Sequence, residues 1–412
     1  MNTLSTHCII AGGGPAGMMC GLLLARAGVD VWVLEKHKDF LRDFRGDTVH
    51  PSTLMVLDEL GLLEKFLQRP HDEVHEISVE IGKQSFKAAD MSLLPTRAKF
   101  VALMPQWDFL DFLAEEAKRY PTFHLAMESE VVEILAKGKR IVGVKVKTPE
   151  ATGDMTARLV IGADGRGSRV REKAGLKVRD FGAPFDVLWL RLPTAPDDPK
   201  QPVGRFINGN LFVMLYRGDY WQCAMLIPKG GFAALKAEGL SGFLGRLRSV
   251  AGFARDRVEA IKSFDDVKLL TVTVDRLLRW ARPGLLCIGD AAHAMSPVGG
   301  VGINLAIQDA VATANILSPI LARRTPSLRE LKRVQKRRLF PTRVVQRFQV
   351  IVQNAVLAPT IRSQVTPRPP LPLYILDRWK WLRQWPARFI GLGVRPEHVR
   401  SKAVTPADSA PT

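Results

Sequence analysis

The chain has 412 residues, enough for two domains with substantial cores, and its 46% hydrophobic and 24% charged residues are typical of a globular protein. It contains no uncharged apolar run of 18 residues, which excludes a membrane-spanning helix. Its four cysteines form no C-x-x-C pair, which disfavours a metal site and favours buried thiols in a reducing compartment.

The first predicted strand, residues 8–11, is followed by a glycine-rich turn and a helix predicted over residues 16–27. Gly12 permits the tight turn, Gly14 lets the backbone approach a pyrophosphate, and Gly17 lets the helix pack close to the strand. The helix N-terminus then offers N–H groups and the positive end of its dipole to phosphates. No basic segment precedes this strand, so we expect a cytoplasmic protein without a signal peptide.

A second strand, predicted over residues 30–34, ends at Glu35. Glu35 follows Gly12 at about the 20-residue spacing at which an acidic side chain accepts hydrogen bonds from a ribose. The strand, helix, strand and acid together predict a dinucleotide site. An ordinary glycine-rich turn in an α/β domain is the alternative.

The next segment, residues 42–63, includes Arg45 and ends in a helix predicted over residues 52–60. His50 precedes that helix. It could donate or accept a proton in a reaction, or it could simply begin the helix at the surface.

A second motif, Leu159 to Gly165, predicts a strand that ends in Ala163-Asp164-Gly165. Asp164 lies at the carboxyl end of the strand, where open α/β sheets bind ligands. Because Asp-Gly is also a frequent hairpin signal, this motif alone leaves a plain β-turn open.

The hydrophobic pattern differs between the motifs: hydrophobic and polar residues alternate over residues 74–86 and 187–192. A hairpin is predicted over residues 206–214 with its turn at Asn208 to Asn210, and residues 220–227 continue it as a strand. These segments predict an antiparallel sheet. Its aromatic and sulfur-containing residues could line an apolar substrate pocket, although any single one could belong to the core: Trp189, Phe206, Phe212, Met214, Trp221 and Met225.

The third motif is a strand over residues 284–289 that ends at Asp290, followed by a thin glycine-rich loop and a helix over residues 305–317. Asp290 could accept hydrogen bonds from a chain of sugar-like hydroxyls. The helix, which we expect to start near Gly302, would aim its positive end at a flat ring beside the loop and favour its negatively charged, reduced form. The three motifs in this order predict a protein that binds one FAD. We interpret His293 as a structural hydrogen-bonding residue.

The C-terminal part carries most of the positive charge: residues 321–412 contain 19 Lys and Arg against 4 Asp and Glu. Residues 329–347 predict a basic helix, and a proline-rich bend and a tryptophan-rich segment follow. We favour a helical layer that covers the FAD domain with a solvated basic face, and leave open a peripheral contact with an anionic membrane or an acidic partner. No motif supports nucleic-acid binding. The apolar positions expected on the basic helix are Leu331, Val334, Leu339, Val344 and Phe348.

The three motifs together resemble the FAD-dependent aromatic hydroxylases, the single-component flavoprotein monooxygenases typified by para-hydroxybenzoate hydroxylase and the ubiquinone-biosynthesis hydroxylases, over about residues 5–320. The resemblance implies roles for individual residues. The positions that match contacts to the ADP part of FAD are Gly12, Gly14, Pro15, Ala16, Gly17, Glu35, Lys36 and Val131. Those that match contacts elsewhere on FAD are Arg45, Gln106, Asp164, Gly289, Asp290, Pro297, Gly300, Gly302, Ile303 and Asn304.

The resemblance also implies the chemistry. NAD(P)H would bind transiently and reduce FAD, O₂ would add to give a flavin hydroperoxide, and one oxygen atom would pass to an electron-rich phenolic, polyketide or quinone-like ring. Pro297, Arg45 and His50 are the candidate catalytic residues. The alternatives are a flavin-dependent reductase of the geranylgeranyl type, a flavin-dependent halogenase, whose Trp-x-Trp-x-Ile-Pro motif is missing, and a non-catalytic FAD-bound scaffold with a basic membrane- or partner-binding tail.

We therefore predict an α/β (α+β) fold with a discontinuous Rossmann-like FAD domain and an inserted antiparallel-sheet substrate domain. The FAD domain would comprise residues 1–75, 100–180 and 270–320, and the substrate domain residues 76–99 and 181–269. A basic helical C-terminal region would span residues 321–400, with a disordered tail over residues 401–412.

Overall fold

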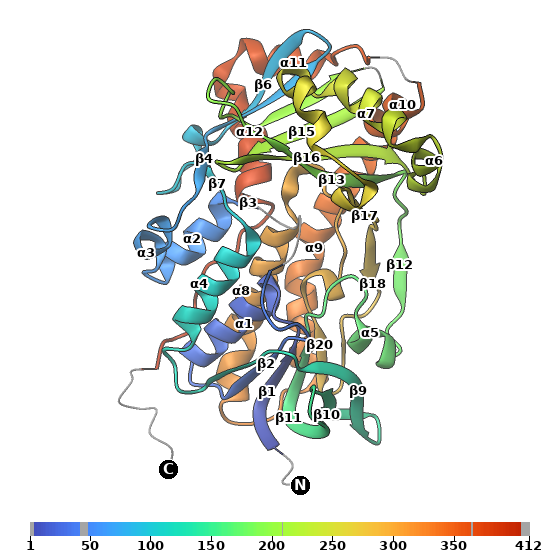
Figure 1. Cartoon of the computed structure of the whole chain (residues 1–412). Coiled ribbons are helices and arrows are strands. Elements are labelled where there is room, and N and C mark those ends of the chain that lie inside the picture. The colour runs from blue at the N-terminus through green and yellow to red at the C-terminus, as the bar shows by residue number, and fades with distance from the viewer. Residues whose placement is uncertain (1–3, 42–47, 208, 364–365, 405–412) are drawn as a thin grey trace.

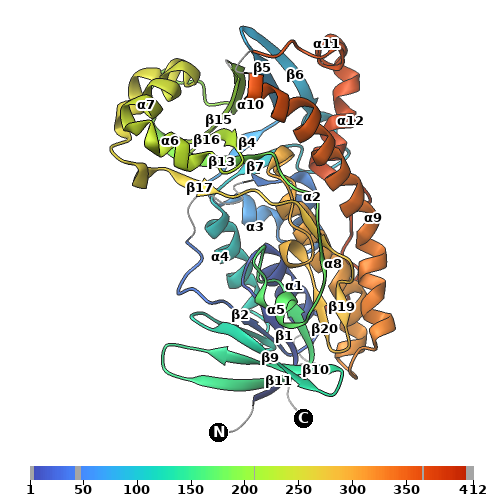
Figure 2. The same cartoon turned by 90° about the vertical axis from the view of Figure 1, so that its right-hand side faces the viewer.

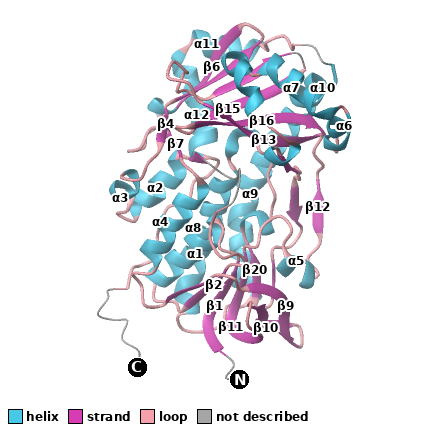
Figure 3. Cartoon of the chain, in the orientation of Figure 1, coloured by secondary structure: helices cyan, strands magenta, loops and turns pink. Residues whose placement is uncertain are grey.

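The computed structural model describes residues 4–41, 48–207, 209–363 and 366–404. Two large sheets lie at opposite ends of the molecule, and long helices fill the space between them (Figures 1 and 3). The mixed α/β architecture confirms the predicted fold class. Within the described ranges, no helix is long and apolar enough to cross a membrane.

The first sheet has eight strands and contains all three glycine-rich motifs. Its parallel centre runs in the order β20 (Leu285–Cys287), β11 (Thr152–Gly162), β1 (Leu4–Ala11), β2 (Val31–Leu34) and β8 (Phe123–Ala126). The strands β9 (Glu130–Lys137), β10 (Arg140–Lys147) and β19 (Ala281–Arg282) add antiparallel pairs. The carboxyl-terminal parts of β1 and β11, residues 8–11 and 159–162, are buried and apolar, as expected for strands covered on both faces.

Next to this sheet, helix α1 (Pro15–Arg26) packs against both α4 (Gln106–Ala117) and α8 (Gly302–Leu321). The start of α8 at Gly302 confirms the expected position. The helix predicted over residues 52–60 is α2 (Pro51–Glu59), and α3 (Leu63–Leu67) follows it. Short strands β3 (Thr48–Val49), β7 (Val101–Leu103) and β4 (Asp72–Val74) form a small sheet nearby.

The second sheet has seven strands, mostly antiparallel. Their order is β17 (Lys268–Leu270), β13 (Phe185–Pro193), β16 (Tyr220–Pro228), β15 (Asn210–Tyr216), β14 (Val203–Ile207), β5 (Glu76–Ile81) and β6 (Gln84–Asp90). The pairing of Ile207 with Asn210 confirms the predicted hairpin. Helices α6 (Phe232–Ala237) and α7 (Gly239–Val250) cover one face of this sheet. The pair β12 (Val178–Asp180) and β18 (Asp275–Leu277) connects the two sheets. We propose that the two sheets mark the FAD and substrate domains.

The basic helix α9 (Leu328–Val352) runs along one flank, from the β19 end of the first sheet towards the second sheet (Figure 2). Leu331 and Val334 lie in the core, as expected for a covering layer. The apolar set is wrong at its C-terminal end: Phe348 is 44% exposed, Val344 is half-buried, and Val345 is buried instead. Gln346 and Gln349 complete the buried face of α9 there and donate hydrogen bonds to backbone carbonyls. Because these buried residues are polar, the hydrophobic pattern did not indicate which face of the helix is buried.

Further C-terminal elements follow α9: a π-helical turn η6 (Gln353–Leu357), α10 (Ala358–Ser363), α11 (Leu371–Arg378), η7 (Lys380–Arg383), α12 (Gln384–Ala387) and η8 (Arg388–Leu392). The chain then returns to α1. Arg26 donates a hydrogen bond to the Ser401 carbonyl, and the Val404 N–H donates to the Arg26 carbonyl. Residues 401–404 are therefore held in place, which differs from the disorder expected from Ser401 on.

Candidate cofactor and substrate site

The loop between β1 and α1 has room for a phosphate at one glycine only. A Cβ on Gly12 would lie 2.4 Å from the Ala163 carbonyl oxygen, and Gly12 has φ +106°. A Cβ on Gly17 would lie 1.9 Å from the Gly12 carbonyl oxygen, so both glycines are required by packing. A Cβ on Gly14 meets no atom within 4 Å. This open space, in front of a helix N-terminus that begins with Pro15 and Ala16, fits the pyrophosphate of a dinucleotide.

The Glu35 carboxylate lies beside this loop. It accepts hydrogen bonds from the Gly13 N–H at 2.9 Å and from the His37 N–H at 3.1 Å. Burial opposes ionisation, but these bonds outweigh it and hold the pKa of Glu35 below its ordinary value. Lys36 is exposed. The Ser129 N–H donates to the Glu35 carbonyl, which brings the start of β9 and the buried Val131 to this end of the site.

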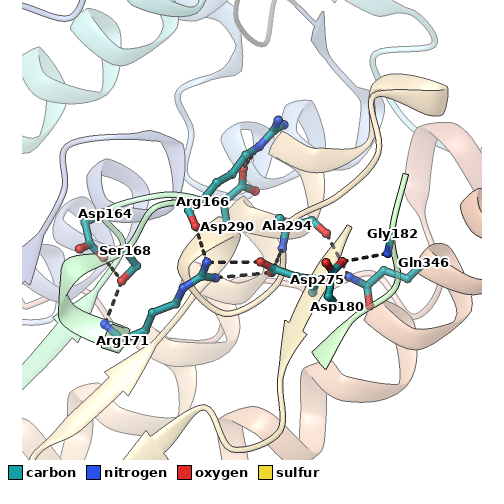
Figure 4. A network of polar contacts seen from close by, with 10 residues as sticks. All are labelled: Asp164, Arg166, Ser168, Arg171, Asp180, Gly182, Asp275, Asp290, Ala294 and Gln346. Carbon is teal, nitrogen blue, oxygen red and sulfur yellow. Dashed lines mark hydrogen bonds and ion pairs between the residues drawn. The ribbon is translucent and has the colours of Figure 1, made fainter. Parts of the chain in front are cut away.

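The Asp164 carboxylate is directed into its own loop (Figure 4). It accepts hydrogen bonds from the Ser168 hydroxyl at 2.5 Å and the Val170 N–H at 3.1 Å, at the start of α5 (Arg169–Lys173). Burial raises the pKa of Asp164 against the effect of these bonds. Asp164 thus shapes the loop at the end of β11, and its contact with a cofactor stays a prediction.

Sequence reasoning missed Arg166, which connects the second and third motifs. Its Nε donates a hydrogen bond to Asp290 Oδ2 at 3.1 Å, and both side chains are one-third exposed (Figure 4). Among the described residues, Arg166 Nη1 is buried without a hydrogen-bond partner. Such an orphaned donor next to Asp290 points to a missing acceptor, which a phosphate or a ribityl oxygen would supply. The signal in the sequence was an arginine inside the Asp-Gly loop.

The loop that carries Asp290 is anchored by a buried cluster of charges. Asp309 on α8 accepts hydrogen bonds from the Gly289 N–H at 3.1 Å, from His293 Nε2 at 2.6 Å and from Arg338 Nε at 2.9 Å. Arg338 also contacts Glu397 at 3.3 Å. Burial opposes ionisation of Asp309, but His293 and Arg338 outweigh it and lower its pKa. The structural role expected for His293 is confirmed.

The loop from Pro297 to Asn304 follows, and it is held between α2 and the C-terminal elements. Gly300 has φ +63°, and a Cβ there would lie 3.2 Å from Thr48 Oγ1 and 3.5 Å from His50 Nε2. The Thr53 hydroxyl donates to Asn304 Oδ1 at 3.4 Å. Ile303 is half-buried, and Gln106, expected to meet the flavin, is half-buried at the start of α4. Arg45 lies outside the described residues.

His50 is buried, with 2% of its surface exposed. Because a carbonyl can only accept, His50 Nδ1 donates the 3.0 Å hydrogen bond to Ile390. Burial lowers the pKa of His50 to about 4, so the ring is neutral at pH 7. His50 therefore joins the Gly300 loop to the C-terminal region.

This burial predicts a pH dependence of stability. The unfolded state binds a proton at His50 below about pH 6.5, whereas the folded state does so only near pH 4, so stability present above pH 6.5 is lost as the pH falls. We expect this group to remove about 2 kcal/mol of unfolding free energy between pH 7.5 and pH 5. His50→Asn retains a donor for the Ile390 carbonyl but does not titrate. Urea unfolding should show that its unfolding free energy falls by about 2 kcal/mol less than that of the parent between pH 7.5 and pH 5. His75→Asn, at an exposed histidine, is the control and should behave as the parent does.

The seven-stranded sheet turns one of its faces towards the Pro297 loop. Val298, Trp189 and Phe206 are partly buried and pack against the same apolar cluster. The same cluster contains Leu211, Val213, Ala224 and Leu226. The residue after the predicted flavin-contacting proline thus meets the apolar face of the sheet.

The residues predicted to line a substrate pocket lie on two different faces of this sheet. Phe212, Met214, Trp221 and Met225 belong to a different cluster, packed under α7 and almost fully buried on the opposite face. Successive side chains of a strand point to opposite faces of the sheet. The predicted set therefore combined residues from both faces. Only Trp189 and Phe206 lie on the face towards the loop. The sequence analysis did not name Leu211, Val213, Ala224 and Leu226, which lie on that face and alternate along the strands with Phe212, Met214 and Met225.

Asp290 provides a direct test of the cofactor site. Asp290→Ala should weaken FAD binding roughly 10- to 100-fold, because a hydrogen bond to a charged group contributes about 1.5–3 kcal/mol. Titration of the apoprotein with FAD measures this change. Asp256→Ala, at a side chain that is 85% exposed, is the control and should bind FAD as the parent does. Equal affinities of the two variants would show that Asp290 does not contact FAD.

Comparison with known proteins identifies the family. The family described as FAD binding domain matches residues 5–231 and 251–348. The chain is 35% identical to 6-methylpretetramide 4-monooxygenase of Streptomyces rimosus over 370 residues, which are 88% of this chain and 87% of that protein. It is 26% identical to 3-demethoxyubiquinol 3-hydroxylase of Escherichia coli, over 84% of this chain and 88% of that protein.

Solved structures show the same fold. PqsL of Pseudomonas aeruginosa, a probable FAD-dependent monooxygenase, aligns with a TM-score of 0.72 and 22% identity over 87% of this chain and 99% of its own. The flavin-dependent brominase Bmp2 aligns with a TM-score of 0.74 and 15% identity, over 94% and 93%. At such low identity these two structures support the fold alone. The family match and the 35% identical relative decide the identity: the chain belongs to the FAD-dependent aromatic monooxygenases.

Proposed function

We propose that this monooxygenase hydroxylates a phenolic, polyketide or quinone-like aromatic ring and consumes NAD(P)H and O₂. The observation that carries the proposal is that Val298, Trp189 and Phe206 all pack against one apolar cluster, which lies on one face of the seven-stranded sheet. It puts the loop that resembles the flavin-contacting loop of the hydroxylases against a surface suited to a flat, apolar substrate. In the overall reaction, the aromatic C–H compound, O₂, NAD(P)H and a proton give the hydroxylated ring, NAD(P)⁺ and water.

The residues present fit FAD. Gly14 leaves space for the pyrophosphate, Glu35 lies where the ribose is expected, and Asp290 and Arg166 offer an acceptor and an unpaired donor for the ribityl chain or phosphate. When bound and reduced, FAD supplies the reaction with O₂ that makes one oxygen atom transferable to the ring.

The chain's own residues would bind and orient the cofactor and the substrate, and exclude water from the site. The N-terminus of α8 directs its positive dipole end towards the Pro297–Gly300 loop and would stabilise negative charge there. We propose that His50 is a positioning residue for this loop, because it is buried between Gly300 and Ile390. Trp189, Phe206 and Val213 would exclude water from the ring-binding side.

A screen of phenols and quinone precursors tests the proposal. A substrate should accelerate NAD(P)H oxidation with equal O₂ uptake, and its product should gain one oxygen atom. Product formation that requires chloride or bromide would instead identify a halogenase. Reduction of substrate without O₂ uptake would identify a reductase.

A further inference from the structure

We propose that the outer surface of the C-terminal elements binds the headgroup region of an anionic lipid bilayer. The tryptophan patch is the name used here for the exposed residues of these consecutive elements: Leu371, Trp379, Trp381 and Trp385 together with Arg378 and Arg388. Leu371 is 70% exposed, and the three tryptophans are 49%, 61% and 63% exposed. The helix α11 has no buried residue at all.

The patch is carried by a fixed backbone. The elements α11, η7 and α12 pack on β6, the edge strand of the seven-stranded sheet, at one end of the molecule (Figures 1 and 2). Ala387 and Leu392 anchor them in a core with Met91. The Arg383 guanidinium is almost fully buried and donates to the carbonyls of Leu376 and Asp377. The indoles are therefore displayed on an ordered surface, where three exposed tryptophans within seven residues require an explanation.

The arginines of the patch indicate which partner it binds. In the described part of the chain, Arg378 and Arg388 are exposed and have no carboxylate partner within salt-bridge distance. Lys380 is paired with Asp90 at 3.6 Å, so it contributes less.

An anionic bilayer satisfies both features of the patch. Indole rings favour the boundary between headgroups and acyl chains, and unpaired arginines favour anionic headgroups. A second copy of the chain would bring like charges together. A nucleic acid would leave Leu371 and the apolar parts of the indoles without a partner.

The test uses the full chain with bound FAD and extruded vesicles. We expect co-sedimentation with vesicles of phosphatidylcholine and phosphatidylglycerol, little with phosphatidylcholine alone, and loss at high salt. Brominated acyl chains should quench part of the tryptophan fluorescence. Replacing all three indoles, in Trp379→Ser/Trp381→Ser/Trp385→Ser, should reduce binding at least about tenfold while FAD is retained.

Matched controls separate this patch from general effects. Leu269→Ser/Leu278→Ser removes exposed apolar side chains elsewhere and should bind vesicles as the parent does. Arg378→Glu/Arg388→Glu should abolish binding, whereas Arg279→Glu/Arg323→Glu, with the same change in net charge at exposed arginines, should largely preserve it.

Three results would overturn the proposal. The first is equal vesicle binding by the triple tryptophan variant and the parent. The second is self-association, seen in analytical ultracentrifugation, that disappears in the triple variant while vesicles do not bind. The third is binding to duplex DNA without binding to vesicles at the same salt concentration.

Discussion

Gly14→Val will give a folded protein that does not retain FAD. A Cβ at Gly14 meets no protein atom within 4 Å, so the substitution should be tolerated by the fold. The valine would occupy the space in front of the α1 N-terminus that a pyrophosphate needs. We expect the purified variant to be colourless, with FAD affinity reduced beyond the range of an equilibrium titration.

The control is Gly153→Val on β11, where a Cβ also meets nothing within 4 Å and the strand favours a β-branched residue. This variant should be yellow. Circular dichroism of both variants distinguishes cofactor loss from unfolding. A folded Gly14→Val protein with normal FAD content would show that the first motif does not hold the pyrophosphate.

Arg338→Met will lower the unfolding free energy more than any other substitution proposed here. Arg338 is fully buried and pairs with Asp309, which is also fully buried and holds the Gly289 N–H. Methionine retains much of the volume but leaves Asp309 with less compensating charge. Removal of one partner of a buried ion pair costs about 3–5 kcal/mol. Because Asp309 anchors the loop of Asp290, FAD binding should weaken as well.

The neighbouring Arg337 offers the matched comparison. It pairs with the same Glu397 at 2.7 Å, but its side chain is 39% exposed. Arg337→Met should cost less, about 1 kcal/mol, because Arg337 is partly solvated and the buried Glu397 keeps its contact with Arg338. Urea unfolding of the two apoproteins measures both values. Similar losses for the two variants would contradict a special role for the buried cluster.

The three glycine-rich loops could be predicted because their signals are local. Gly12, Gly14 and Gly17 lie within six residues, and each glycine follows from the requirements of one turn. The strands before Asp164 and Asp290 are short apolar runs that end at a polar residue. Parallel strands whose carboxyl ends meet at one edge then bring these motifs together.

The sheet face towards the Pro297 loop and the buried cluster could not be predicted in the same way. Whether Phe212 or Val213 faces the Pro297 loop depends on which sheet face α7 covers, and the sequence of the strand is apolar on both faces. The cluster combines Asp309, Arg338 and Glu397 from three distant segments, so no local pattern links them. The exposure of Trp379, Trp381 and Trp385 likewise depends on how α11 and α12 pack on β6.

Incorporation of oxygen from ¹⁸O₂ tests the central claim most directly. With an aromatic substrate that stimulates NAD(P)H oxidation, the product should contain one ¹⁸O atom per molecule, and one NAD(P)H should be consumed per product. Gly14→Val should form none. A product whose added oxygen comes from water, or a product formed without O₂, would contradict the assignment as a hydroxylating monooxygenase.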